Sequence, residues 1–213
     1  MEKEKIVLSF NESLLRMSDI ELLKGPHWLN DTLISFYLEY LEKVAFAGEN
    51  YLLFVSPEVT QCIKIISHNE VDLFLAPLKV EKRQFIFFVV NDNSSAAIGG
   101  SHWSLLVYSR PETCFFHFDS SLGCNRASAY SIARVLAEHL TANPGQLVED
   151  VTTLQQDNGY DCGVHVLCNI DLIADHVSRY NKVRGCGVSS KKVIDGKRYQ
   201  ILNVIKELGG NIL

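Results

Sequence analysis

The chain has 213 residues, of which 47% are hydrophobic and 21% charged, a composition that can bury a core and is unlike that of a disordered segment. The formal net charge of −5 argues against a nucleic-acid backbone as partner, because phosphate binding needs a basic face. No apolar run approaches the roughly 20 residues that span a bilayer, and the charged first residues are unlike a signal peptide. We therefore expect a soluble intracellular protein, cytoplasmic and/or nuclear, with its cysteines reduced.

The first third of the chain is predicted to be mainly helical. After a short strand over residues 6–10, helices are expected over residues 30–43, 56–66 and 70–75. Asn30 and Asp31 can cap the first of these helices. The second helix starts at Ser56, followed by Pro57 in the first turn, where proline is tolerated.

The pattern changes to strands in the middle of the chain. Residues 84–90 form a continuous apolar run, which is typical of a strand buried on both faces. Further strands are expected over residues 102–109, 113–119 and 148–154, and helices over 125–140, 162–180 and 197–208. Helices, a sheet and helices again predict an α+β fold. Because no repeat or long linker interrupts it, the whole chain, residues 1–213, is expected to form a single domain.

Two of the predicted strands form a hairpin that places a histidine beside an aspartate. If Ser109 pairs with Cys114, then Ser104 faces Asp119, and Asp119 becomes the diagonal same-face neighbour of His102. A carboxylate in that position can accept the imidazole N–H, select its tautomer and stabilise its positive charge. The spacing therefore predicts a His102–Asp119 pair.

The polar segment at residues 155–163 leads into the apolar helix that is predicted to begin at Cys162. A helix N-terminus carries partial positive charge that favours a thiolate, and a nearby imidazolium stabilises it further. Gly159 and Gly163 flank the thiol and permit a sharp turn and close approach of a substrate backbone. The backbone N–H of Cys162 and the side-chain amide of Gln156 could together form an oxyanion hole.

The other cysteines lack this context. Cys62, Cys114 and Cys168 lie in apolar patterns and are expected to be small buried residues, while Cys124 and Cys186 lie in predicted loops without an obvious base. A metal site is an alternative, since Cys114 and His117, like Cys162 and His165, have ligand-like spacing. Residues three apart on a strand point to opposite faces, so the first pair cannot chelate without a bulge. We therefore expect no metal and no cofactor.

Four motifs in order resemble the Ulp/sentrin-specific cysteine protease family. They are Trp-Leu-Asn-Asp at residues 28–31, Gly-Ser-His-Trp-Ser at 100–104, Phe-Asp-Ser at 118–120 and Gln-x4-Asp-Cys-Gly at 156–163. Their order and spacing match from about residue 6 to residue 208. The resemblance implies a papain-like architecture, with a central mixed sheet flanked by helices and the active site between two lobes. The order His, Asp, Gln, Cys is permuted, because papain-like enzymes place the cysteine first.

The resemblance also implies a role for each matching residue. Cys162 corresponds to the nucleophile, His102 to the general base, Asp119 to its orienting carboxylate and Gln156 to the oxyanion donor. Trp28 and Trp103 correspond to two tryptophans that close over a narrow Gly-Gly tail, and Asp31 is expected to bind a basic residue of the modifier. Residues 93–100 end in Gly99 and Gly100, and we expect this loop to act as a lid hinged at the two glycines.

Within the family, residues 56–61 and 89–93 resemble the deneddylase branch. The implied activity is cleavage after the C-terminal Gly-Gly of a NEDD-type ubiquitin-like modifier, both in its precursor and in its lysine conjugates, such as those of cullins. A SUMO-directed protease of the same family would share the catalytic residues. A non-catalytic module that binds ubiquitin-like proteins, or acyl transfer to another acceptor, also stays open at this point.

Overall fold

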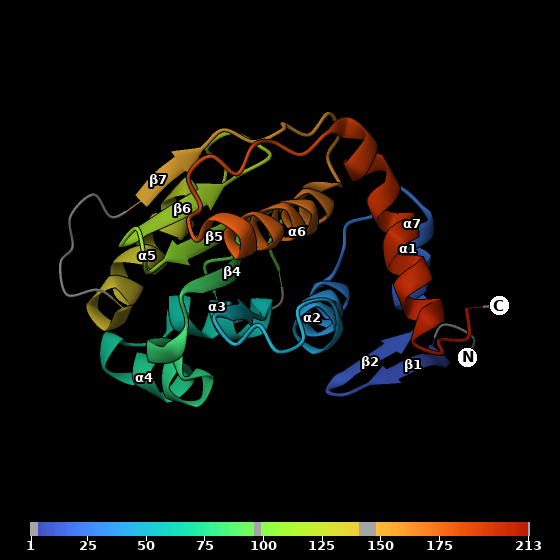
Figure 1. The fold of residues 1–213 in the computed structure, drawn as a ribbon. Helices are drawn as coiled ribbons and strands as arrows, with labels where there is room; N and C mark the ends of the chain where they lie inside the picture. The colour runs from blue at the N-terminus through green and yellow to red at the C-terminus, as the bar shows by residue number, and fades with distance from the viewer. Residues whose placement is uncertain (1–3, 96–98, 141–147, 213) are drawn as a thin grey trace.

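The structure, a computed structural model, describes residues 4–95, 99–140 and 148–212 (Figure 1). Within them lie the strands β1 Ile6–Phe10, β2 Ser13–Arg16, β3 Leu52–Val55, β4 Phe85–Asn91, β5 Trp103–Ser109, β6 Cys114–Phe118 and β7 Val148–Val151. The α-helices are α1 Met17–Lys24, α2 Asp31–Tyr40, α3 Pro57–Ile65, α4 Val71–Leu75, α5 Arg126–Leu140, α6 Cys162–Tyr180 and α7 Lys191–Glu207. No helix in this part of the chain is long and apolar enough to cross a membrane.

The core of the fold is a mixed sheet in the order β3-β4-β5-β6-β7, which confirms the predicted α+β class. β5 runs antiparallel to both of its neighbours, while the outer pairs β3–β4 and β6–β7 are parallel. β1 and β2 form a separate hairpin near α1 and α7 (Figure 1).

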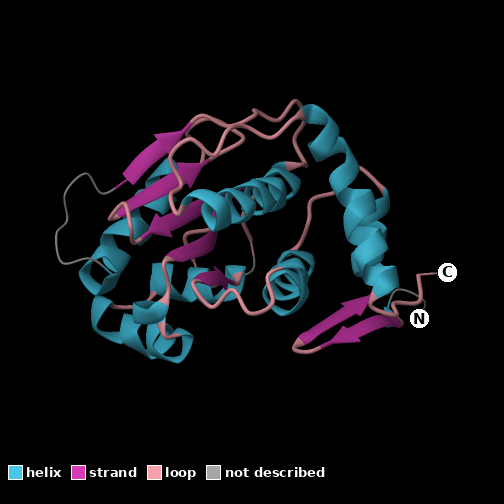
Figure 2. Ribbon diagram, viewed as in Figure 1, coloured by secondary structure: helices cyan, strands magenta, loops and turns pink. Residues whose placement is uncertain are grey.

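Helices cover both faces of the central sheet (Figure 2), which explains why its middle strands are apolar throughout. Alternate residues of β4 enter two different cores: Phe87 packs with α2, α6 and α7 on one face, and Phe88 packs with α3 and α5 on the other. Because α6 lies on this sheet with its N-terminus at residue 162, its first residue is held at a defined place beside the strand ends.

The hairpin register follows the prediction. Ser109 pairs with Cys114 and Leu105 with Phe118, so the strand ends that carry His102 and Asp119 lie side by side. The predicted helix start at Asn30 is also confirmed, since its side chain accepts a hydrogen bond from the Leu33 N–H at 3.0 Å. α6 has the predicted bounds.

Other predicted bounds were wrong. The last helix begins at Lys191 rather than at residue 197, because Ser190 caps it by accepting from the Val193 N–H and Ile194 packs into the core. Gly196 lies within α7, where one glycine costs only about 1 kcal/mol relative to alanine. β7 ends at Val151, and α2 gives way to a π-helical turn, Leu41–Ala45, before residue 43.

Three elements were missing from the prediction: β2, α1 and β3. The four residues of β3 are a strand because they pair in parallel with β4, a contact between distant segments that a local pattern does not carry. The predicted lid at 93–100 includes residues 96–98, which lie outside the described residues, so the lid remains a prediction.

Candidate active site

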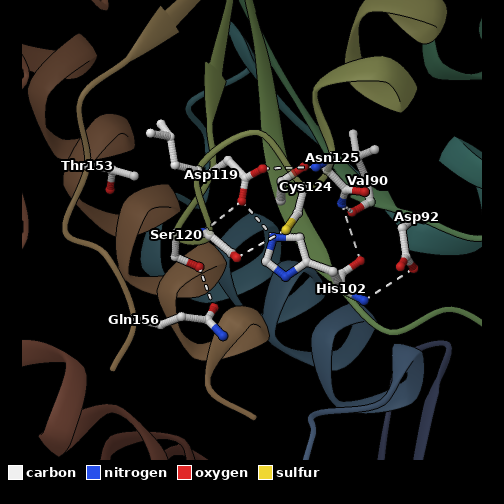
Figure 3. A network of polar contacts seen from close by, with 12 residues as sticks. Val90, Asp92, His102, Asp119, Ser120, Cys124, Asn125, Thr153 and Gln156 are labelled. Atoms are coloured by element: carbon white, nitrogen blue, oxygen red, sulfur yellow. Dashed lines mark hydrogen bonds and ion pairs between the residues drawn. The ribbon is translucent and has the colours of Figure 1, made fainter. Parts of the chain in front are cut away.

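The strand ends of the β5–β6 hairpin bring His102 and Asp119 into contact. Nε2 of His102 donates to Oδ1 of Asp119 at 2.6 Å, and both residues are buried (Figure 3). Asp119 also accepts from the backbone N–H of Ser121 at Oδ1 and from that of Asn125 at Oδ2, each at 3.0 Å. The carboxylate therefore has a single orientation, toward the imidazole.

This geometry favours the charged forms of both side chains. Burial lowers the pKa of the His102 imidazole, but hydrogen bonds to Asp119 and to Cys162, together with the charges of both, raise it to about 10. Burial raises the pKa of the Asp119 carboxyl, but the hydrogen bonds from His102 and from two backbone N–H groups hold it below its usual value. An imidazolium beside a carboxylate is the result at neutral pH.

Cys162 lies on the other side of the imidazole, as the first residue of α6. The interaction of its side chain with His102 raises the pKa of the imidazole. Because Nε2 of His102 is occupied by Asp119, Nδ1 is the ring nitrogen that remains for the thiol. The positive end of α6 and the imidazolium therefore act on the same sulfur atom, and both stabilise a thiolate.

His102 and Cys162 line a cleft of about 540 Å³ together with Trp28, Trp103 and Asp31. Five of the seven residues predicted for the site thus meet in one cavity, although they come from three separate segments of the chain. Asp119 and Gln156 are not among the described residues that line it. Asp119 reaches the cleft through His102.

The two tryptophans are held by hydrogen bonds across the cleft. Trp28 is half exposed, so it is not a core residue, and its indole N–H donates to the carbonyl of Gly159 at 2.5 Å. The indole N–H of Trp103 donates to the carbonyl of Leu29 at 3.1 Å. Both rings are therefore fixed close to the residues that precede and follow the thiol.

Gly163 packs closely against the wall of the cleft. A Cβ atom there would lie 3.1 Å from Cβ of Leu29 and 3.5 Å from Cδ1 of Trp103. The absence of a side chain at Gly163 thus lets the wall of the cleft approach the start of α6 closely, while the approach of a substrate backbone there stays a prediction. At Gly159 a Cβ would meet nothing within 4 Å.

Gln156 is tied to the loop after the catalytic aspartate. Its Oε1 accepts from Oγ of Ser120 at 2.8 Å, its backbone N–H donates to the Ser120 carbonyl at 2.8 Å, and its Nε2 donates to the carbonyl of Asn158 at 2.7 Å. One of the two N–H groups of the Gln156 amide therefore already donates a hydrogen bond. Its role as an oxyanion donor stays a prediction.

The sequence did not identify the residues that hydrogen-bond to the backbone of His102. Asn125 is fully buried, and its Nδ2 donates to the carbonyls of Val90 at 3.0 Å and His102 at 3.2 Å (Figure 3). Asp92 accepts from the backbone N–H of His102 at 3.2 Å. The only signal in the sequence was the position of Asn125 at the start of a predicted helix, which gives no sign of these bonds.

His117, one of the residues that suggested a metal site, has other partners. His117 bonds Ser104 through Nε2 and Asp150 through Nδ1, both at 3.1 Å. Among the described residues, no group of three His, Cys, Asp or Glu could hold a metal ion. Cys114 and Cys168 are buried as predicted, and burial raises the pKa of Cys168 to about 12. The prediction for Cys62 was wrong, because this residue is partly exposed and lines the cleft.

Comparison with known proteins identifies the fold and the family. A model of the Ulp1 protease family, C-terminal catalytic domain, matches residues 27–208. The chain is 42% identical to sentrin-specific protease 8 of Rattus norvegicus over 83% of this chain and 82% of that protein. It is 35% identical to NEDD8-specific protease 1 of Arabidopsis thaliana over 81% and 76%, respectively.

Solved structures agree on the architecture. The C-terminal Ulp1 protease domain, crystallised with the yeast ortholog of SUMO, superimposes with a TM-score of 0.73 at 20% identity, over 96% of this chain and 88% of that one. The mixed sheet flanked by helices is thus the Ulp1-like fold, as the motifs predicted. On this evidence the chain belongs to the Ulp1 protease family and is a cysteine protease.

Proposed function

We propose that this protein cleaves the bond after the C-terminal Gly-Gly of NEDD8, both in its precursor and in lysine conjugates such as those of cullins, with residues 1–213 acting as one catalytic domain. The observation that carries the proposal is the His102–Asp119 pair at 2.6 Å next to Cys162, in a cleft bordered by Trp28 and Trp103. Similarity to proteins named sentrin-specific protease 8 and NEDD8-specific protease 1 supports the choice of modifier.

The reaction follows from the protonation states of the site. The Cys162 thiolate attacks the carbonyl carbon of the last glycine, and the negative charge moves to the carbonyl oxygen. The backbone N–H of Cys162 and the amide of Gln156 are the proposed donors to that oxygen, and loss of one such donor typically costs on the order of 100-fold in rate.

His102 then acts first as a general acid and afterwards as a general base. Its imidazolium gives a proton to the departing amine as the C–N bond breaks, which leaves a thioester and a neutral imidazole. The imidazole next removes a proton from water, and the water oxygen attacks the thioester carbonyl. This step releases the modifier carboxylate and regenerates the pair of Cys162 thiolate and His102 imidazolium. Asp119 keeps Nε2 engaged throughout, so that Nδ1 faces the reacting atoms.

The shape of the cleft suits a tail without side chains near the reacting bond. Indole rings fixed on both sides of the path accept glycine and exclude bulkier residues. Asp31 and Glu58 also line the cleft and provide two carboxylates that suit a basic residue of the tail.

Covalent capture tests the proposal. The protein is incubated separately with NEDD8, SUMO and ubiquitin, each carrying an alkyne electrophile in place of its last glycine carboxylate, and adducts are detected by mass. We expect an adduct with NEDD8 at Cys162 and none in the Cys162→Ala variant. Reaction with SUMO alone would assign the protein to the other branch of the family. Binding of a modifier without any adduct would support a non-catalytic module.

A further inference from the structure

Arg198 of α7 reaches the residue that precedes the nucleophile. Its Nε and Nη2 donate to Oδ1 of Asp161 at 3.2 and 2.7 Å. Both side chains of this ion pair are only 15% exposed, so solvent screens it weakly. Asp161 is the residue immediately before Cys162, at the N-terminus of α6.

The same guanidinium holds two other segments of the chain. Nη1 donates to the carbonyl of Leu22 in α1 at 2.7 Å, and Nη2 donates to the carbonyl of His27 at 2.6 Å. His27 directly precedes Trp28, whose indole is bonded to Gly159 at 2.5 Å. One arginine therefore links α1, the segment that carries Trp28 and the start of α6.

The charge of Arg198 matters for the thiolate. A carboxylate on the residue next to Cys162 opposes a second negative charge on the sulfur atom. Asp161 does not cap α6 with its side chain; its Oδ1 pairs with Arg198 and its Oδ2 accepts from Asn158 at 2.8 Å. Neutralisation by Arg198 leaves the positive end of the helix and the imidazolium as the main fields at the thiol.

We propose that Arg198 is a positioning residue with two effects: it neutralises Asp161 beside the nucleophile, and its fork of donors fixes the Trp28 segment against the start of α6. This inference rests on the proposed function of Cys162 and Trp28. The two effects separate by chemistry, because a lysine keeps the charge but has no planar fork that could serve three acceptors at once.

The charge effect is measured without any modifier. Alkylation of Cys162 by iodoacetamide is followed against pH by mass spectrometry of the peptide that contains it. We expect Arg198→Met to move the midpoint of the rate profile to higher pH by about 0.5 to 1 unit, because Asp161 loses its counter-charge. Arg198→Lys should keep the wild-type midpoint. The double variant Arg198→Met/Asp161→Asn, which removes both charges, should return the midpoint to within about 0.2 unit of wild type.

The fork effect is measured with a substrate, the C-terminal aminocoumarin amide of NEDD8. We expect both Arg198→Lys and Arg198→Met to raise KM about tenfold, because the Trp28 segment loses its anchor. The double variant should keep the raised KM although its alkylation midpoint is normal. This separation is the result that a merely structural role would not produce.

The matched control is Arg179→Met, which removes a 2.7 Å ion pair with Asp175 at the C-terminal end of α6, far along that helix from Cys162. Thermal unfolding of all variants checks the fold. The inference would be overturned if Arg198→Met and Arg179→Met had the same midpoint of the alkylation rate profile and the same KM. If wild-type protein hydrolyses no modifier amide, the proposed function fails, while the alkylation profiles still decide whether Arg198 acts on Cys162.

Discussion

The side-chain amide of Asn125 donates to the backbone carbonyl of His102 at 3.2 Å, across 23 residues of sequence. The backbone N–H of the same asparagine donates to Oδ2 of Asp119 at 3.0 Å. One buried residue therefore touches both members of the pair that activates the thiol, once through its side chain and once through its main chain. Replacing its side chain should disturb the position of His102 directly, while the main-chain bond to Asp119 remains.

Asn125→Asp keeps the shape of the side chain but removes both of its N–H donors. We expect kcat for the NEDD8 aminocoumarin amide to fall about tenfold or more, with KM nearly unchanged, because the residue contacts the triad and not the cleft. The unfolding free energy should fall by about 1–3 kcal/mol in a urea titration.

Thr153→Val is the matched control for Asn125. Thr153 is also buried, and its Oγ1 donates to Oδ1 of Asn169 at 3.2 Å rather than to a member of the triad. This variant should lose stability by a similar amount without the change in kcat. Equal effects of the two variants on kcat would mean that Asn125 supports only the fold.

The pH dependence of activity should report the environment of His102. Because its pKa is raised to about 10, the imidazolium that protonates the leaving amine persists well above the usual value of 6.5. As pH rises through about 10 this proton is lost, so the alkaline limb of kcat/KM should fall there.

Asp119→Asn removes the negative charge of Asp119, which raises the pKa of His102, whereas burial still lowers this pKa and Cys162 still raises it. The alkaline limb should therefore move to lower pH by more than about 1 unit, and kcat should fall on the order of 100-fold or more. An unchanged limb would show that a group other than His102 controls it. Measuring kcat and kcat/KM from pH 5 to 11 in a buffer of constant ionic strength gives the position of the alkaline limb and the fall in kcat.

Gly163→Ala tests the contact between the helix start and the cleft wall. The new Cβ would lie 3.1 Å from Leu29 and must push this residue, and with it the Trp103 indole that is bonded to its carbonyl. We expect KM for the same amide to rise about five- to tenfold, while the unfolding free energy falls by about 1 kcal/mol or more.

Gly196→Ala is the comparison for this substitution, because a Cβ at that position of α7 meets nothing within 4 Å. It should leave KM unchanged and stabilise the helix by up to about 1 kcal/mol. If Gly163→Ala were as well tolerated as Gly196→Ala in both measurements, the close packing at residue 163 would not restrict the cleft.

Local sequence determined the parts of the site that depend on short spacing. The four-residue connection between Ser109 and Cys114 sets a hairpin register, and strand alternation then places His102 and Asp119 on one face. The switch from a polar segment to an apolar helix places Cys162 at a helix start. Both features could be predicted because each depends on neighbours only a few residues away.

Tertiary structure decided the contacts between distant segments. Trp28 bonds the carbonyl of Gly159, 131 residues later, and Arg198 bonds the carbonyl of His27, 171 residues earlier. The position of Asn125 at the start of a predicted helix gave no sign of its bonds to His102 and Asp119, and the start of α7 depends on the core position of Ile194. No periodicity records such contacts, because they form only when the sheet, α6 and α7 pack together and bury the polar groups that must then pair.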